Sequence, residues 1–240
     1  MNATPADFHF SPIATVHSPY REKFGIPRQP GLAAVDAVVE LLPTFASADA
    51  VSGLDQFSHI WISFVFHAVS AREWKPLVRP PRLGGNEKIG VFATRSTHRP
   101  NPLGLSVVEL LRVEINEGVR LHIRGGDLLD GTPVLDIKPY IPYADCIADA
   151  RAGYAQLAPI RLVVRWQLDA DSAKIDTQTQ QLIAEVLSLD PRPAYQEEPA
   201  RVYGMHIASY NVRFRIDSDG VEIIRIESLQ NSNKPSETRK

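Results

Sequence analysis

Short apolar runs recur through the first two thirds of the chain, and turn residues separate them. The runs are rich in β-branched and aromatic residues and cover 59–66, 89–93, 106–111, 119–123, 133–137 and 160–166. Runs of this length and spacing predict the strands of a closed or nearly closed β-barrel. Apolar and polar side chains alternate in 119–123, which indicates a strand with one face in water. Prolines cluster in 76–102 and 133–142, so we expect no long helix between residues 70 and 160.

The pattern changes near residue 167. Residues 174–189 carry apolar side chains close to helical spacing, and Asp190-Pro191 follows as a stop signal. The runs 210–216 and 221–226 flank an Asp-Ser-Asp-Gly turn, which predicts a β-hairpin. The predicted fold class is therefore mainly β, with a β-barrel domain over 1–167, a small α+β domain over 168–228 and a disordered tail over 229–240.

Composition narrows the class of protein. The chain has 240 residues, of which 44% are apolar and 22% charged, so it can bury a sizeable core and is not wholly disordered. Its net charge of −2 excludes a uniformly basic nucleic-acid binder but allows a local basic face. Cys146 is the single cysteine, so no internal disulfide forms, which fits a reducing, cytoplasmic protein. No apolar run is long enough for a membrane helix, and no signal peptide is visible.

Two loops are unusually rich in hydrogen-bond donors. The first, 18–31, is stiffened by prolines and contains Arg21, Lys23, Arg28 and Gln29; a solvated connection is an equally good interpretation. The second, 90–104, holds Arg95, Ser96, Thr97, His98, Arg99 and Asn101 between two predicted strands. Because guanidinium groups pair bidentately with carboxylate or phosphate, the second loop suits an anionic or nucleotide ligand. The alternative for it is a hydrogen-bonded, capped turn.

A third polar segment spans 127–140. Asp130-Gly131 is a turn signal whose backbone groups could read an adenine edge, while Asp130 or Thr132 binds a ribose. Asp136, Lys138 and Tyr140 alternate along one strand face, so they either pair with one another or line a site. His67 follows an apolar strand, where a structural role is the more frequent one.

Two further classes of site find no support in the sequence. The histidines and aspartates show no metal-ligand spacing, so we predict no metal site. No glycine-rich dinucleotide or phosphate-loop motif follows a strand, which leaves a Rossmann fold unsupported.

Charge is concentrated in 70–100, which holds seven Lys and Arg residues against two Glu residues. Lys and Arg contacts to phosphate give RNA affinity without requiring a basic protein overall. A merely solvated loop is an equal alternative.

At these residues the sequence resembles the TrmO family, also called TsaA or YaeB. The matching strings are SPYREKFGIPRQPG, GLDQFSHIWISFVFH, RPPRLGGN, GVFATRSTHRPNPLGLSVVEL, DLLDGTPVLDIKPYIPYAD and DPRPAYQ, in order over about residues 12–215. The resemblance implies a single-barrel S-adenosylmethionine-binding domain, a small C-terminal domain and a homodimer. It also implies methylation of the exocyclic amino nitrogen of N6-threonylcarbamoyladenosine, next to the anticodon of threonine tRNAs.

The resemblance also assigns roles to residues. The cofactor is expected to meet Pro27, Arg28, Gln29, His67, Ala68 (through its backbone), Arg95, Leu105, Asp130, Gly131, Thr132 and Pro133. The Arg95 loop and the Asp130–Pro133 turn are expected on opposite sides of it. Tyr20, Arg21 and Lys23 are candidates for substrate contact, and Arg79 and Arg82 for contact with tRNA phosphates, outside the cofactor pocket.

Methyl transfer requires the nucleophile, the methyl group and the sulfur to be held in line. The carbamoyl group delocalises the lone pair of the substrate's amine nitrogen and lowers its proton affinity, so a base that removes the proton from this nitrogen is useful. Asp136 is the candidate base, with Lys138 and Tyr140 positioning the substrate. Two rival functions remain: a non-catalytic barrel that binds S-adenosylmethionine or RNA, and a hydrolase or lyase acting on an adenosine nucleoside.

Overall fold

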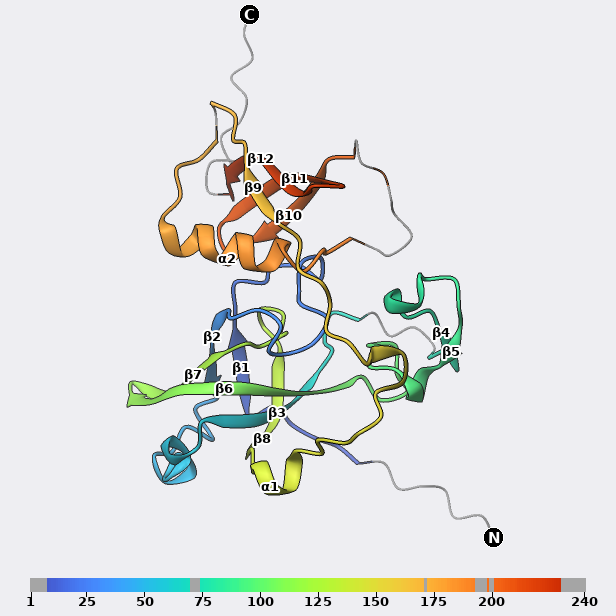
Figure 1. The fold of residues 1–240 in the computed structure, drawn as a ribbon. Coiled ribbons are helices and arrows are strands. Elements are labelled where there is room, and N and C mark those ends of the chain that lie inside the picture. Colours follow the sequence, from blue (N-terminus) through green and yellow to red (C-terminus); the bar gives the residue numbers. More distant parts are fainter. Residues whose placement is uncertain (1–7, 70–73, 171, 193–197, 199–200, 230–240) are drawn as a thin grey trace, which may run out of the picture.

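Six antiparallel strands close into a barrel in the computed structural model, which describes residues 8–69, 74–170, 172–192, 198 and 201–229. Around the barrel the strands run β1 (Ala14–His17), β2 (Asp36–Leu41), β7 (Gly118–Arg124), β6 (Leu103–Asn116), β3 (His59–Val65) and β8 (Pro133–Pro139), and β8 returns to β1 (Figure 1). Closure leaves no free sheet edge in the barrel.

Alternating side chains fill the barrel interior. Ile60, Ile62 and Phe64 of β3 point inward and are buried together with residues of β7 and β8. Gly104 of β6 lies opposite Phe64, and a Cβ at this position would overlap the Phe64 ring. A glycine is therefore required where the large ring fills the end of the barrel.

A second sheet forms the C-terminal unit. Its strands are ordered β10 (Tyr203–Ile207), β11 (Tyr210–Asp217), β12 (Gly220–Ser228) and β9 (Val164–Trp166), with β9 parallel to β12. Helix α2 (Thr177–Leu187) begins after Asp176, whose side chain accepts a hydrogen bond from the backbone N–H of Thr179 at 2.9 Å. It packs its apolar side against the sheet and lies on the barrel side of it (Figure 1).

The loop between β1 and β2 joins the two units. Tyr20, Ala33 and Val35 are buried in the same core as α2 and the C-terminal sheet. Tyr20 forms an isolated bridge to Ile207 of β10, so the barrel's first connection completes the core of the C-terminal unit.

The remaining described segments form short elements. Two-stranded pairing of β4 (Leu77–Val78) with β5 (Ile89–Gly90) makes a small lobe beside the barrel, together with the 3-10 turns Pro81–Leu83 and Val91–Ala93 (Figure 1). Other short turns are Asp49–Val51, Leu54–Gln56, Gly153–Ala155 and α1 (Pro142–Asp145). Within the described ranges, no helix is both long enough and apolar enough to cross a membrane.

The predicted fold class, mainly β with a barrel and a small α+β unit, is confirmed. The strands expected over 59–66, 106–111, 119–123 and 133–137, the helix over 174–189 and the hairpin are present, with changed bounds. The run 160–166 forms only a three-residue strand, and it pairs with β12 instead of joining the barrel. The C-terminal sheet therefore begins before the boundary expected at residue 167. Residues 230–240 of the expected tail lie outside the described residues.

Candidate functional site

Three neighbouring strands bring most predicted cofactor residues to one end of the barrel. Phe64 pairs with Val134 of β8, and Val65 pairs with Leu103 of β6. The end of β3, the start of β8 and the start of β6 therefore meet. His67 follows β3, the turn 130–133 precedes β8, and Leu105 lies near the start of β6. Residues 67, 105 and 130–133 are thus brought together by strand pairing alone.

The turn 130–133 is held against the first polar loop. The Asp130 carboxylate accepts a hydrogen bond from the Ser18 backbone N–H at 3.0 Å and forms an ion pair with Arg21. Gly131 has φ +77°, and its N–H donates to the Val16 carbonyl at 2.8 Å. A glycine suits this left-handed position because it carries no Cβ. The turn and the loop therefore form one fixed wall at the barrel end.

The second polar loop reaches the first through Arg95. Its Nη1 donates to Gln29 Oε1 at 2.5 Å, and the Arg95 side chain is otherwise exposed. Two loops that are distant in sequence thus present an amide and a guanidinium side by side. Pro27, two positions before Gln29 in the sequence, is buried, whereas Ala68, which follows β3, is exposed.

Arg28 points to a different neighbour. Its Nη2 donates to the Arg192 carbonyl at 2.7 Å. Although the residue is exposed, lost hydration of the guanidinium lowers the pKa of Arg28; the nearby Arg82 charge lowers it further, and Asp190 opposes the change. Arg82, expected to lie away from the cofactor pocket, is therefore close enough to influence a predicted cofactor residue.

One carboxyl group at this end was not among the predicted site residues. Asp127 follows β7 and accepts a hydrogen bond from Ser106 Oγ at 2.6 Å. Burial raises the pKa of Asp127, while the bond from Ser106 and the charge of Arg95 lower it. Ser106 itself is buried and lies next to Leu105. The sequence offers one signal for this site: a carboxylate directly after Gly125-Gly126 at a strand end.

The three predicted catalytic residues lie on the outer face of the barrel. Asp136 is opposite Ser63 of β3, and Ser63 is opposite Leu105 of β6, so Asp136 and Leu105 lie in one row across three strands. Lys138 forms an ion pair with Asp136. The Tyr140 ring lies 6.0 Å from the Trp61 ring, between centroids. Desolvation raises the pKa of Tyr140, and Cys146 and Asp145 add to the effect.

The predicted substrate contacts have different surroundings. Tyr20 is 3% exposed and packs in the core of the C-terminal unit, so it does not offer a surface for direct contact with tRNA. Lys23 and Arg79 are exposed. Arg82 Nη1 donates to the Leu157 carbonyl at 2.6 Å, which ties the lobe to the segment before β9. Residues 70–73 of the predicted basic stretch lie outside the described residues.

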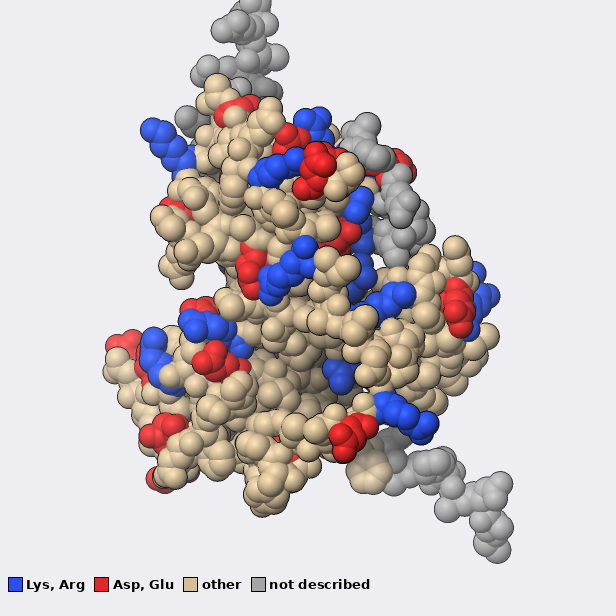
Figure 2. Space-filling model, in the orientation of Figure 1, with Lys and Arg blue, Asp and Glu red and all other residues tan. Residues whose placement is uncertain are grey.

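Figure 2 shows a hollow at the centre of one face, with Lys and Arg side chains in it and along the side toward the lobe. Positive charge therefore gathers where the barrel, the C-terminal unit and the lobe approach one another. No group of three or more His, Cys, Asp or Glu side chains that could hold a metal ion occurs in the described part of the chain. The prediction of no metal site stays a prediction.

The fold and the site define a class of protein: a closed β-barrel that carries polar loops at one end and an appended α+β unit. The chain matches the family model for the tRNA-methyltransferase O N-terminal domain over residues 15–146 and the TrmO C-terminal domain over residues 160–229. It therefore belongs to the TrmO family, as its sequence motifs predicted.

Individual relatives agree with this assignment. The chain is 45% identical to the tRNA (adenine(37)-N6)-methyltransferase of Escherichia coli, over 92% of this chain and 99% of that protein. It is 40% identical to a Pyrococcus abyssi protein named as a probable S-adenosyl-L-methionine-binding protein, over 61% of this chain and 76% of the relative. A crystal structure of TrmO from Pseudomonas aeruginosa superposes with a TM-score of 0.74 at 38% identity, covering 93% of this chain and 99% of that one.

Proposed function

We propose that this protein is an S-adenosylmethionine-dependent tRNA methyltransferase that methylates the exocyclic N6 nitrogen of adenosine 37, next to the anticodon. The family membership and the name of the Escherichia coli relative support the reaction. The observation that carries the proposal is the convergence of the predicted cofactor segments on one barrel end. The substrate base is N6-threonylcarbamoyladenosine, whose carbamoyl group makes base assistance useful.

The residues at the barrel end suit S-adenosylmethionine. The paired Arg95 and Gln29 offer donors for its carboxylate, the turn 130–133 offers backbone groups and a carboxylate for its adenosine part, and Leu105 is an exposed apolar neighbour. His67, Ala68, Pro27 and Arg28 complete the proposed set. The cofactor, when bound, supplies a methyl group activated by its sulfonium. The protein's task is then to place the substrate nitrogen in line with that group.

Proton removal from the substrate amine is assigned to Asp136. Its carboxylate lies on the outer face of β8 in the same row as Leu105 and forms an ion pair with Lys138. The phenol of Tyr140 is protonated at neutral pH, as an ordinary tyrosine is, and can donate a hydrogen bond; desolvation raises its pKa further. Lys138 and Tyr140 are therefore proposed to position the threonyl carboxylate or the base.

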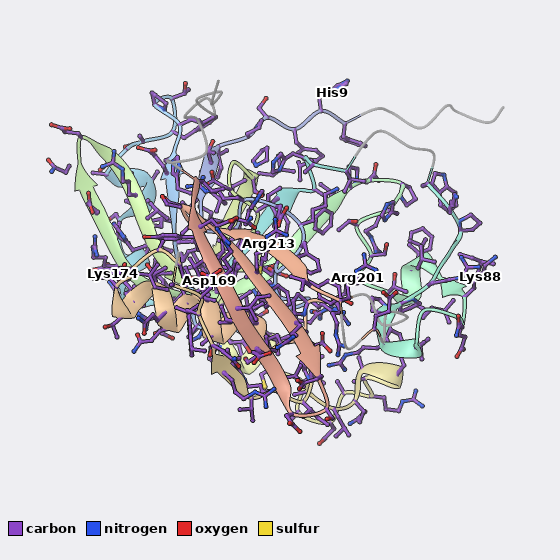
Figure 3. All side chains as sticks on the ribbon, turned by 90° about the horizontal axis from the view of Figure 1, so that it is seen from above. His9, Lys88, Asp169, Lys174, Arg201 and Arg213 are labelled. Atoms are coloured by element: carbon purple, nitrogen blue, oxygen red, sulfur yellow. The ribbon has the colours of Figure 1, made fainter. Side chains whose placement is uncertain are left out.

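The tRNA is proposed to approach over the positively charged side of the molecule. Arg21, Lys23, Arg79 and Arg82 are the proposed phosphate contacts from the barrel and the lobe. Figure 3 shows Arg201, from the C-terminal unit, on the side toward the lobe that carries Lys88. Contacts of this kind orient the RNA without reading its sequence.

We also propose that the protein acts in the cytoplasm as a homodimer. The exposed apolar residues support a partner: Leu105 is 57% exposed beside the site, and Leu157 and Ile160 are 79% and 86% exposed on the segment before β9. Exposed apolar side chains of this kind favour an interface with a partner. Light scattering at micromolar concentration is expected to give twice the chain mass, and Leu157→Glu with Ile160→Glu is expected to give the monomer. A monomeric parent protein contradicts the proposal.

Mass spectrometry of tRNA nucleosides tests the function. Threonine tRNA carrying the threonylcarbamoyl group is incubated with the protein and S-adenosylmethionine, and one added methyl group on the modified adenosine is expected. A cleaved nucleoside would instead favour a hydrolase or lyase. Binding of the cofactor with no product would favour a non-catalytic barrel, and it would overturn the proposed function.

A further inference from the structure

Asp127 stands out at the barrel end because it is a carboxyl group in a largely enclosed place with few partners. Among the described residues, Ser106 is the only side chain that donates a hydrogen bond to it, at 2.6 Å. A carboxylate removed from water without matching donors or a cation is costly. The nearby Tyr20 hydroxyl does not remove this cost, because it is buried without a hydrogen-bond partner within the described ranges.

Backbone contacts bring Asp127 close to the Arg95–Gln29 pair. The Gly31 N–H donates to the Gly125 carbonyl at 2.8 Å, which joins the loop carrying Gln29 to the segment carrying Asp127. Gly125 has φ +81°, and a Cβ there would lie 3.4 Å from the Gly31 Cα, so the two loops touch through glycines. Arg95 is near enough for its charge to lower the pKa of Asp127.

Arg95 and Asp127 nevertheless do not bond to each other. No ion pair joins them in the part of the chain that the structure describes, because Arg95 donates to Gln29 and Asp127 accepts from Ser106. Two side chains of opposite charge thus lie near each other, but each is hydrogen-bonded to a neutral partner instead of to the other. A ligand that carries an ammonium and a carboxylate on one carbon atom would complement this arrangement, since each of its charges would meet one of opposite sign.

We propose that Asp127 and Arg95 together bind the zwitterionic amino-acid end of S-adenosylmethionine, with Asp127 accepting from its ammonium and Arg95 donating to its carboxylate. This inference rests on the proposed function and adds to it a cofactor-binding residue, Asp127. Ser106 acts as a positioning residue, because its hydroxyl fixes the orientation of the carboxylate. The site is then specific for ligands with a free amino acid end.

Calorimetry with three ligands tests the inference on the full chain. S-adenosylmethionine carries both charges, its decarboxylated form carries only the ammonium, and 5′-methylthioadenosine carries neither. Asp127→Asn is expected to weaken the first two ligands about ten- to a hundredfold and to leave the third unchanged, as expected for the loss of one charged hydrogen bond. Arg95→Ala is expected to weaken only S-adenosylmethionine.

Two further variants separate charge from folding. Ser106→Ala keeps the carboxylate and is expected to give a smaller loss with the same ligand pattern. Asp55→Asn removes an exposed carboxylate near the opposite end of β3 and is expected to change nothing. Thermal unfolding of each variant checks the fold, and Ser106→Ala carries the test if Asp127→Asn does not fold.

Two results would overturn the assignment of Asp127. One is an equal loss of affinity for all three ligands in Asp127→Asn, which is the signature of a structural role. The other is an unchanged affinity for all three ligands. Ser106→Ala is judged in the same way if Asp127→Asn does not fold. In both cases the proposed function stands, since the parent protein still binds S-adenosylmethionine. Absence of binding to the parent protein would overturn the inference and the proposed function together.

Discussion

Arg95 Nη1 donates a hydrogen bond to Gln29 Oε1 at 2.5 Å, although the two residues are 66 positions apart in the chain. This contact fixes an exposed guanidinium that would otherwise sample many rotamers. Gln29→Ala is therefore expected to weaken S-adenosylmethionine binding about three- to tenfold, which is less than the loss in Arg95→Ala. The Arg95 charge remains, and only its orientation and the neutral Gln29 donor are lost. Calorimetry on both variants measures the order, and a larger loss in Gln29→Ala would contradict it.

Replacement of the outer-face residues is expected to affect turnover and to spare cofactor binding. Asp136→Asn removes the proposed base and is expected to lower kcat about a hundredfold or more, in the range of general base catalysis. Tyr140→Phe keeps the ring against Trp61 and is expected to cost less, since it removes one donor only. Single-turnover assays beside calorimetry give both quantities, and unchanged kcat in Asp136→Asn would remove Asp136 from the mechanism.

The two arginines of the lobe are expected to contribute to tRNA affinity through phosphates. Replacement of both Arg79 and Arg82 by Ala is expected to weaken tRNA binding at low salt and to reduce the slope of log affinity against log salt by about one to two units. Lys174→Ala, on the segment before α2, serves as the control (Figure 3). An equal salt slope in the parent and the double variant would mean that these side chains are only solvated.

Arg82 is also expected to influence cofactor binding, through its effect on Arg28. Because its charge helps to lower the pKa of Arg28, Arg82→Ala relieves a repulsion between like charges, whereas Arg79→Ala does not. A small change in cofactor affinity, about twofold, is expected for Arg82→Ala alone. Calorimetry on the two single variants decides this, and identical affinities would show that the lobe acts on tRNA only.

Tyr20→Phe is expected to leave the protein at least as stable as the parent. The Tyr20 hydroxyl is buried without a partner in the described part of the chain, and burial together with the Asp127 and Glu185 charges strongly raises its pKa. Removing an unpaired buried hydroxyl while keeping the ring removes a desolvation cost of about 1–3 kcal/mol. Urea unfolding measures the difference, and a marked loss of stability would show that the hydroxyl does have a partner, such as a bound water.

The sequence alone predicted the elements whose signal is local. The strand around Ile60, the helix after Asp176 and the hairpin at Asp217–Gly220 have apolar periodicity and turn or cap residues within their own segments. The family motifs predicted the fold class and the reaction, and both agree with the comparisons. They also supplied the proposed cofactor residues, which remain proposals.

Tertiary structure decided what depends on distant partners. Strand β1 has only four residues, and its place is set by pairing with β2 and β8. The run at 160–166 reads as a barrel strand, yet its last residues add to β12 because that sheet edge offers free backbone groups. Tyr20 belongs to a polar loop but is buried, since the C-terminal sheet folds over it. The approach of Asp127 to Arg95 depends on contacts between distant loops, since the Gly31 N–H donates to the Gly125 carbonyl and Arg95 donates to Gln29.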